Sequence, residues 1–187
     1  MKTLKLMIIA PLMALSILNV SAKSQSAGLY LTVQDYLSHK LSYGTGSDKI
    51  KISGLFGSKT VVLTHDSKKQ VFAKSEIFGY SKDGLDYRFF NNVEYRILSA
   101  KGLLIYSRST LVQQGKGPKP TEQYYFSSGL SDSIQPLTIA NIKGVYAKYP
   151  KFTYAVESLF KNDGDLAAYD SYNKQYKIAW LYSQNAM

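Results

Sequence analysis

Between Lys49 and Ser127 the hydrophobic residues fall in short runs that alternate with polar positions or with turn residues. Lys49–Ile52 alternates polar and apolar side chains, and Thr60–Thr64 is rich in β-branched residues. Both patterns are typical of strands half buried in a sheet. Similar runs predict further strands at 70–74, 76–80, 85–90, 93–98, 103–108 and 122–127. Turn-forming residues between these runs predict turns at 65–68, 81–84 and 101–102, and a loop at 115–120.

The clearest local signal is a β-hairpin centred on Asn91-Asn92. Asparagine tolerates left-handed backbone angles, which both central residues of a two-residue type I′ turn require. The sequence therefore predicts that strands 85–90 and 93–98 are joined directly by this turn. A four-residue loop, which would shift the pairs by one position on each side, is the alternative.

After Ser128 the hydrophobic positions recur about every 3.6 residues, which indicates helices. Thr138 is expected to cap a first helix, and Pro150 to separate it from a second. The residues expected to face the core are Ile139, Ile142, Val145, Tyr146 and Tyr149 in the first helix, and Phe152, Ala155, Val156, Leu159 and Phe160 in the second.

The turn at 162–164 leads to Asp165, which is expected to cap a third helix. That helix would face the core with Leu166, Tyr169, Asn173, Tyr176 and Trp180. A break near Gln175 into a terminal strand is the alternative. Near the other end, Thr32 is expected to cap a short helix that begins at Val33.

The order of these elements, strands first and helices last, predicts one α+β domain over residues 23–187. We expect an antiparallel meander of about six to eight strands, an open sheet or a partial barrel, with the C-terminal helices packed on it.

Residues 1–22 have the pattern of a signal peptide. Lys2 and Lys5 precede the mostly apolar stretch Leu6–Val20, and Val20-Ser21-Ala22 offers small residues for cleavage after Ala22. A helix of this stretch would rise about 22 Å, short of a bilayer core of roughly 30 Å. We therefore expect an exported protein, periplasmic or secreted, with no transmembrane segment in the mature chain; an uncleaved signal anchor is the alternative.

Charge and composition narrow the functional classes. The chain has no cysteine and two histidines, so disulfides, thiolate catalysis and cysteine-ligated metals are excluded, and no cofactor is expected. Without Lys2 and Lys5, 21 basic residues stand against 13 acidic ones, a net charge of +8. Such a surface can recruit an acidic glycan or a lipid head group, or it can simply be a solvated face. Export argues against nucleic acid as the partner.

Four kinds of short motif suggest catalysis or metal binding, and each has a simpler explanation. The Ser-x-x-Lys spacing at 158–161 and 171–174 lacks the accompanying motifs of penicilloyl-serine enzymes. Residues 162–165 resemble a fragment of a calcium loop, but a turn followed by a helix cap explains them. Residues 115–117 lack the spacing of a phosphate loop. His65-Asp66 could belong to a His-Asp-Ser triad, for which the sequence identifies no serine.

The sixteen tyrosines are the most unusual feature of the composition. Tyrosine combines a flat apolar ring with a polar tip, so clustered tyrosines can stack on sugars or simply fill sheet faces. In the predicted hairpin, Tyr87 lies opposite Arg96 and Arg88 opposite Tyr95, with one pair on each face of the sheet. Together with Arg108, these four residues are the candidate ligand-binding residues, and stacking within the sheet is the alternative role for the arginines.

Several short segments together suggest a relationship. They are Leu29-Tyr30-Leu31-Thr32, Asp35-Tyr36, Tyr87-Arg88-Phe89, 94–98, Tyr125-Phe126-Ser127, Pro136-Leu137-Thr138, 166–170 and Tyr176-Lys177-Ile178. Over about residues 28–182, the chain resembles a family of uncharacterised exported proteins of Bacteroidota-type bacteria. The resemblance implies a periplasmic or secreted bacterial protein, and it implies no activity, substrate or catalytic residue. Because the signal segment holds no cysteine, unlike that of exported lipoproteins, no acyl anchor is expected.

These observations favour a non-catalytic binding or envelope-associated protein. Its expected partner is an acidic glycan, a lipid head group or another envelope protein. A hydrolase acting on an envelope polymer, and a structural subunit that pairs through aromatic surfaces, are the alternatives.

Overall fold

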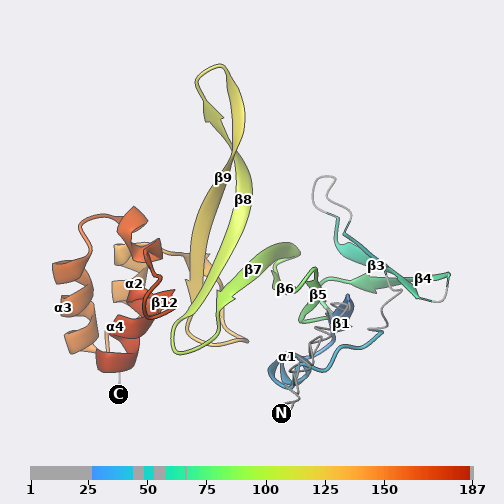
Figure 1. Ribbon diagram of the computed structural model, residues 1–187, viewed down its shortest axis with the longest axis horizontal. Coiled ribbons are helices and arrows are strands. Elements are labelled where there is room, and N and C mark those ends of the chain that lie inside the picture. The colour runs from blue at the N-terminus through green and yellow to red at the C-terminus, as the bar shows by residue number, and fades with distance from the viewer. Residues whose placement is uncertain (1–26, 44–48, 53–57, 66, 186–187) are drawn as a thin grey trace, which may run out of the picture.

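The computed structural model describes residues 27–43, 49–52, 58–65 and 67–185 (Figure 1). The predicted signal peptide and its cleavage site therefore lie outside the described residues. In chain order the elements are β1 Gly28–Tyr30, α1 Val33–Leu37, β2 Lys49–Ile52, β3 Thr60–His65, β4 Lys68–Ala73, β5 Gly79–Lys82, β6 Leu85–Phe90, β7 Val93–Ser99, β8 Leu104–Gln114, β9 Gly117–Ser127, β10 Gln135–Pro136, α2 Ile139–Val145, α3 Pro150–Leu159, the 3₁₀ helix η1 Asp163–Ala167, β11 Tyr169–Asp170, β12 Gln175–Tyr176 and α4 Lys177–Asn185.

The main layer is an open, antiparallel, seven-stranded sheet in the order β1-β5-β6-β7-β8-β9-β10. Strands β5 to β10 are neighbours in chain order, so the predicted α+β meander with C-terminal helices is confirmed. Strands β2, β3 and β4 form a separate three-stranded sheet, which the sequence pattern did not distinguish from the meander. In Figure 1 the helices lie at one end of the main sheet and the β2–β4 sheet at the other.

The β6–β7 hairpin confirms the predicted turn and register. Asn91 has φ +50° and Asn92 has φ +62°, as a type I′ turn requires. The pairing across the hairpin places Tyr87 opposite Arg96 and Arg88 opposite Tyr95. On the neighbouring strand, a Cβ at Gly79 would lie 1.9 Å from the carbonyl oxygen of Tyr87, so glycine is needed there for close approach of the backbones.

The predicted loop at 115–120 is largely wrong, because strand pairing continues through most of it. Gly115-Lys116 is the turn, with Gly115 at φ +58°, and β9 begins at Gly117. Pro118 and Pro120 pair with Gln113 and Leu111, respectively, inside the ladder. The pair Gln114–Gly117 closes the turn, and from there residues of β9 bond to β8 at alternate positions. Both prolines lie at the positions in between, which donate no hydrogen bond to β8. A missing N–H there breaks no ladder bond, which explains why a proline-rich segment stays in a strand.

The helices begin where their caps predict. The Thr32 side chain accepts from the Asp35 N–H and the Asp35 carboxylate accepts from the Thr32 N–H, a capping box. The Thr138 hydroxyl accepts from the Asn141 N–H at the start of α2. Pro150 occupies the first turn of α3, where its missing N–H costs no helical bond.

The predicted third helix from Asp165 is wrong. The alternative, in which that helix breaks near Gln175 into a terminal strand, is right only in that a two-residue strand, β12, begins at Gln175; a helix follows it. Asn162 caps η1, and Asp165 is the third residue of that short helix, with its carboxylate bonded back to the Asn162 N–H. A β11–β12 hairpin follows, in which the Asp170 carboxylate accepts from the N–H groups of Tyr172 and Asn173 and stabilises a turn instead of a helix. The last helix, α4, begins at Lys177.

The helical core uses most of the positions expected to be buried. The apolar side chains that pack between α2, α3, α4 and the sheet include Ile105, Phe126, Ile142, Phe152, Val156, Leu166 and Ile178. Six residues expected to face the core are instead exposed: Val145, Tyr149, Leu159, Tyr169, Asn173 and Trp180. The short helices bury a narrower stripe than an idealised helix of the expected length would. None of the described helices is long and apolar enough to cross a membrane.

Candidate functional site

Side chains of the main sheet alternate between its two faces. We call the face that carries Tyr87 of β6 the Tyr87 face, and the other one the opposite face. On the Tyr87 face, the cluster under the helices lies over β8 and β9. A second cluster on the same face, with Leu29, Tyr80 and Phe89, packs against Val61 and Leu63 of the β2–β4 sheet. The Tyr87 face is therefore covered at its two ends by different layers.

Between these two covers the strand register builds a continuous row of side chains. Tyr87, Arg96, Ser107 and Tyr124 stand directly opposite one another on β6, β7, β8 and β9. Arg96 is exposed and Tyr124 is 36% exposed. We call the uncovered part of this face the open strip; its residues are Tyr87, Glu94, Arg96, Glu122 and Tyr124.

One end of the open strip is rigidly built. The rings of Tyr80 and Tyr87 stack with centroids 4.6 Å apart and planes 4° from parallel. The Tyr80 hydroxyl donates to Glu94 Oε2 at 3.0 Å, which holds that carboxylate on the strip. Burial, reinforced by Glu94, raises the pKa of Tyr80, so its hydroxyl stays a donor. Burial also raises the pKa of Tyr87, although Arg96 opposes the shift.

The other end of the open strip is bordered by the β11–β12 hairpin. Tyr169 and Tyr176 contact edge to face there, with ring centroids 5.1 Å apart. Burial raises the pKa of Tyr176, and the phenols of Tyr124 and Tyr169 add to the shift while Arg96 lowers it. Tyr176 also packs against the buried cluster that lies over β8 and β9, which places the hairpin beside the row of side chains on the sheet. The strip thus lies between two aromatic pairs, Tyr80–Tyr87 and Tyr169–Tyr176.

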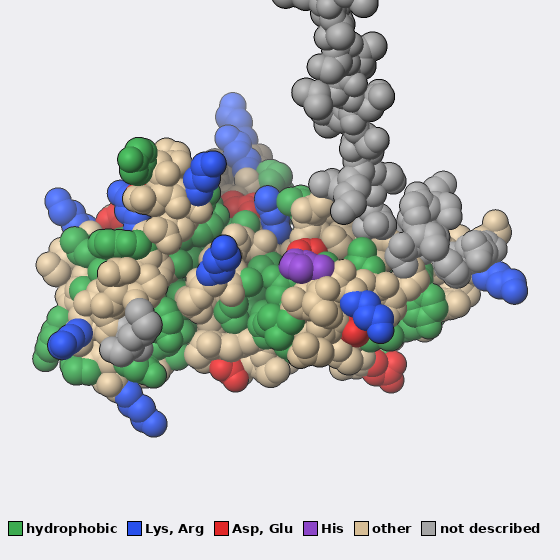
Figure 2. Space-filling view, turned by 60° about the horizontal axis from the view of Figure 1, so that its bottom comes forward, with side chains coloured by type: hydrophobic (Ala, Val, Ile, Leu, Met, Phe, Trp, Pro, Cys, Tyr) green, Lys and Arg blue, Asp and Glu red, His purple; other side chains and the backbone are tan. Residues whose placement is uncertain are grey.

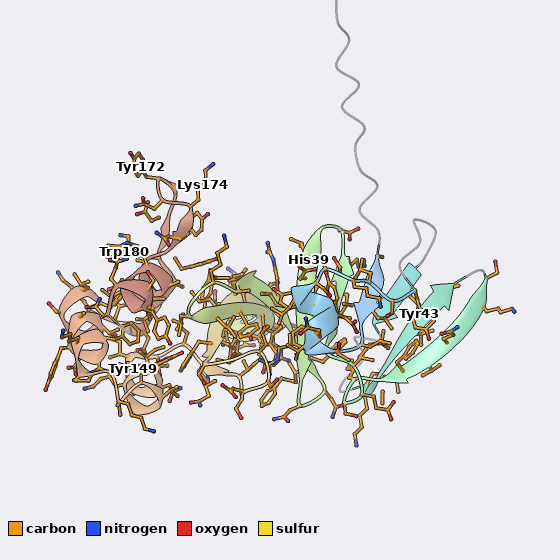
Figure 3. All side chains as sticks on the ribbon, turned by 90° about the horizontal axis from the view of Figure 1, so that it is seen from below. His39, Tyr43, Tyr149, Tyr172, Lys174 and Trp180 are labelled. Atoms are coloured by element: carbon orange, nitrogen blue, oxygen red, sulfur yellow. The ribbon has the colours of Figure 1, made fainter. Side chains whose placement is uncertain are left out.

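The tip of the β11–β12 hairpin carries Tyr172, which is 92% exposed. Figure 3 shows Tyr172 and Lys174 pointing away from the body of the molecule, on the same side of the helical layer as Trp180. Hydrogen bonds from Asn173 lower the pKa of Asp170, which keeps the carboxylate ionised as the acceptor that shapes this turn.

Ser107 is an unusual element of the row. It is 1% exposed, and its hydroxyl has no hydrogen-bond partner among the residues that the structure describes. It lies between Arg96 and Tyr124, directly beneath the exposed part of the strip. A buried hydroxyl without a partner is costly, so a ligand or water that reaches Ser107 would gain a hydrogen bond there.

On the opposite face the Tyr–Arg pair is buried, because the segment around 128–134 covers it. Arg88 is 4% exposed and donates to Tyr106 Oη at 2.9 Å, Ser127 Oγ at 3.3 Å and the Asp132 carbonyl at 2.6 Å. Tyr95 is buried beside it. With its donors engaged by the protein, Arg88 joins the covering segment to the sheet.

The five sequence-predicted ligand residues are thus divided between the faces. Tyr87 and Arg96 come together on the open strip, whereas Arg88 and Tyr95 lie buried on the other face. Arg108 is exposed on that second face, near enough to Tyr95 to lower its pKa against the raising effect of burial.

Sequence reasoning missed Glu122, Tyr124, Tyr169 and Tyr176. A hairpin turn predicted at 115–116 instead of a loop would have placed Tyr124 opposite Ser107. For Tyr169 and Tyr176, no local signal indicates that a distant hairpin borders the sheet.

The other motifs have the simpler explanations. Residues 162–165 are the turn and cap described above. Residues 115–117 are a hairpin turn and the first residue of β9, and the hollow at this tip is lined by the consecutive residues 114–119. In the part of the chain that the structure describes, no group of three acidic or histidine side chains is arranged to hold a metal ion. Asp66 lies outside the described residues, so a site at His65-Asp66 stays untested.

The basic residues are not gathered on the face seen in Figure 2, where Lys and Arg side chains are spread over the surface. Recognition by one large basic patch therefore has no support from that view. The open strip instead offers aromatic rings, one exposed guanidinium and two carboxylates, a combination suited to stacking and to directed hydrogen bonds.

No protein-family model, no curated protein and no solved structure matches this chain.

Proposed function

We propose that the protein is an exported, non-catalytic binding protein whose open strip takes an acidic glycan. The observation that carries the proposal is the row on the Tyr87 face, in which the exposed Arg96 lies between Tyr87 on β6 and, beyond Ser107, Tyr124 on β9. Sugar rings stack on flat aromatic side chains, and a guanidinium matches the carboxylate of an acidic sugar by two parallel hydrogen bonds.

The hydrogen-bonding groups around Arg96 support a glycan as the ligand. Among the described residues, Arg96 forms no hydrogen bond or ion pair, so its donors are free for a ligand. Glu94, held by Tyr80, and Glu122 would accept bonds from sugar hydroxyls. A lipid head group would bind to Arg96 but would make no use of the two carboxylates and the tyrosines. A glycan is therefore the better fit.

Binding of soluble acidic polysaccharides, measured by titration calorimetry, tests the proposal with two matched arginines. Arg96→Ala should weaken binding about tenfold or more, because a charge-assisted hydrogen bond contributes about 1.5–3 kcal/mol. Arg108→Ala removes an exposed arginine from the opposite face of the same sheet and should leave affinity unchanged. Equal losses in the two variants, or no binding of any acidic glycan by the wild type, would refute the proposal.

The same mixtures separate binding from hydrolysis. We expect the polysaccharide to keep its length and its number of reducing ends after prolonged incubation with the protein. An increase in reducing ends that Glu122→Gln abolishes would instead establish the alternative of an enzyme acting on an envelope polymer.

Export is the second part of the proposal, and it rests on the sequence pattern of residues 1–22 and on the resemblance to exported bacterial proteins. N-terminal sequencing of the protein recovered from outside the cytoplasm should begin at Lys23. A chain that begins at Met1 in the membrane fraction would contradict cleavage.

A further inference from the structure

We infer that the outer edge of β8 is a pairing surface for β8 of a second copy of this chain. The β8–β9 hairpin extends well beyond the rest of the sheet, as Figure 1 shows. Pairing between β7 and β8 ends at Arg96 and Ser107. Beyond Ser107, β8 continues to Gln114 with β9 as its one strand neighbour among the described residues.

The two edges of this projecting hairpin differ. In the β8–β9 ladder, residues of β8 bond to β9 at alternate positions, starting from the closing pair Gln114–Gly117. The N–H and C=O groups of Ser109, Leu111 and Gln113 therefore point away from β9 into the open. On β9, Pro118 and Pro120 occupy the corresponding outward positions and supply no N–H.

Proline residues and charged side chains at the edge of a sheet prevent the addition of another strand. The β9 edge thus carries two blocking residues. The β8 edge carries none over the seven residues 109–115, which are uncharged, and Leu111 is 71% exposed. A hairpin protected on one side alone is suited to take one further strand, and to form a closed pair instead of an open fibre.

The same edge is complementary to itself in one register. An antiparallel pair centred on Leu111 places Leu111 opposite Leu111 and Ser109 opposite Gln113, so every outward-pointing group meets another. In this register Arg108 lies opposite Gln114. A shift of the centre to Val112 would place Arg108 opposite Lys116, and like charges directly opposite each other destabilise a sheet. A centre at Thr110 would place Gln113 opposite Ser107, whose outward groups already pair with Arg96 of β7. Of these three centres, Leu111 alone avoids both conflicts.

Molecular mass in solution tests the dimer, and light scattering over a range of concentrations measures it. The wild type should approach twice the mass of one chain as concentration rises. Leu111→Lys would place two like charges opposite each other and should give a folded monomer. Its melting temperature should equal that of the wild type at dilutions where the wild type is also monomeric, since the side chain is exposed. Val71→Lys, at a residue 64% exposed on β4, is the matched control and should still dimerise.

The register is tested by cross-linking, which the absence of cysteine from the chain makes unambiguous. Leu111→Cys brings two thiols directly opposite each other, where Cα atoms about 5.5 Å apart permit a disulfide. Gln113→Cys would hold its two thiols four residues apart along the strands, about 13 Å, which forbids one. Oxidation should therefore link the Leu111→Cys chains into dimers at a rate about tenfold or more above that of Gln113→Cys.

A wild type that stays monomeric at every concentration, or a Leu111→Lys variant that still dimerises, would overturn the inference. Equal cross-linking of the two cysteine variants, or cross-linking of Val112→Cys alone, would overturn the register. None of these measurements involves a glycan, so their failure would leave the proposed binding function standing, and the reverse also holds.

Discussion

Arg88 is a charged side chain held almost entirely by neutral groups of the protein. Its guanidinium bonds to two hydroxyls and to the Asp132 carbonyl, with Phe78 and Phe90 around it. A lysine at this position has one charged nitrogen and cannot reach acceptors on several sides. Arg88→Lys should therefore lower the free energy of unfolding by about 1–3 kcal/mol, because the buried hydroxyls of Tyr106 and Ser127 and the Asp132 carbonyl would not all keep a charged donor.

Urea denaturation measures this loss. Arg96→Lys, the same substitution on the exposed face of the same hairpin, should change the free energy of unfolding by less than about 0.5 kcal/mol. Equal unfolding midpoints for the two variants would show that the hydrogen bonds of Arg88 contribute nothing to stability.

The pair Arg88 and Arg96 also marks a limit of sequence reasoning. The hairpin register, and with it the opposition of each arginine to a tyrosine, was predictable because it depends on the local turn chemistry of Asn91-Asn92. Which arginine is buried was not, because the segment that covers Arg88 lies some forty residues further along the chain. Local pattern places both residues on the sheet, but long-range packing decides which of them can meet a ligand.

At the scale of elements, the β6–β7 turn permits a direct test of the left-handed backbone at Asn92, whose φ is +62°. Asn92→Gly should leave stability unchanged or raise it slightly, since glycine adopts this angle without a Cβ clash. The Asn92 carbonyl that accepts from Lys74 Nζ is kept in either variant. Asn92→Val should cost roughly 1–2 kcal/mol, because a β-branched side chain resists a left-handed backbone. Thermal melts of the two variants give the comparison, and identical melting temperatures would rule out strain at this position.

The start of β9 and the β11–β12 hairpin were not predicted, and each has a physical reason. Residues 117–120 contain two prolines, and such a run indicates a loop unless the position of each missing N–H relative to the partner strand is known. In the tail, the helical period of 166–180 is interrupted where Asp170 bonds to backbone N–H groups and Lys174 adopts φ +51°. Side chains that compete for backbone donors can override hydrophobic periodicity over a few residues.

At the scale of the whole molecule, the meander and its helices follow from local pattern, while the open strip does not. Its existence depends on where the β2–β4 sheet and the helices stop covering the Tyr87 face. Those limits are set by packing between segments that are distant along the chain. The charge count likewise indicated a basic surface but gave no information about Arg96, which lies between two aromatic pairs contributed by four different elements.

The buried tyrosines make the stability of the whole fold depend on pH in the alkaline range. Burial raises the pKa of Tyr36 to about 12, and burial also raises the pKa values of Tyr30, Tyr80 and Tyr146, which lie in three different parts of the core. An unfolded tyrosine ionises near pH 10. Above that pH the unfolded chain releases protons that the folded chain retains, so the free energy of unfolding falls as pH rises. Below pH 10 both states hold these protons, and the four phenols add no pH dependence.

Between pH 10 and the folded pKa, each such phenol should reduce the free energy of unfolding by about 1.4 kcal/mol per pH unit. With several phenols acting together, we expect cooperative unfolding within one or two units above pH 10. Tyrosinate absorbance and far-ultraviolet circular dichroism, followed in one alkaline titration, test this directly. The exposed tyrosines, such as Tyr154 and Tyr172, should ionise first without loss of structure. The buried ones should then ionise in the same step in which the sheet signal is lost. Smooth ionisation of every tyrosine near pH 10 with the circular dichroism intact would contradict the burial on which this expectation depends.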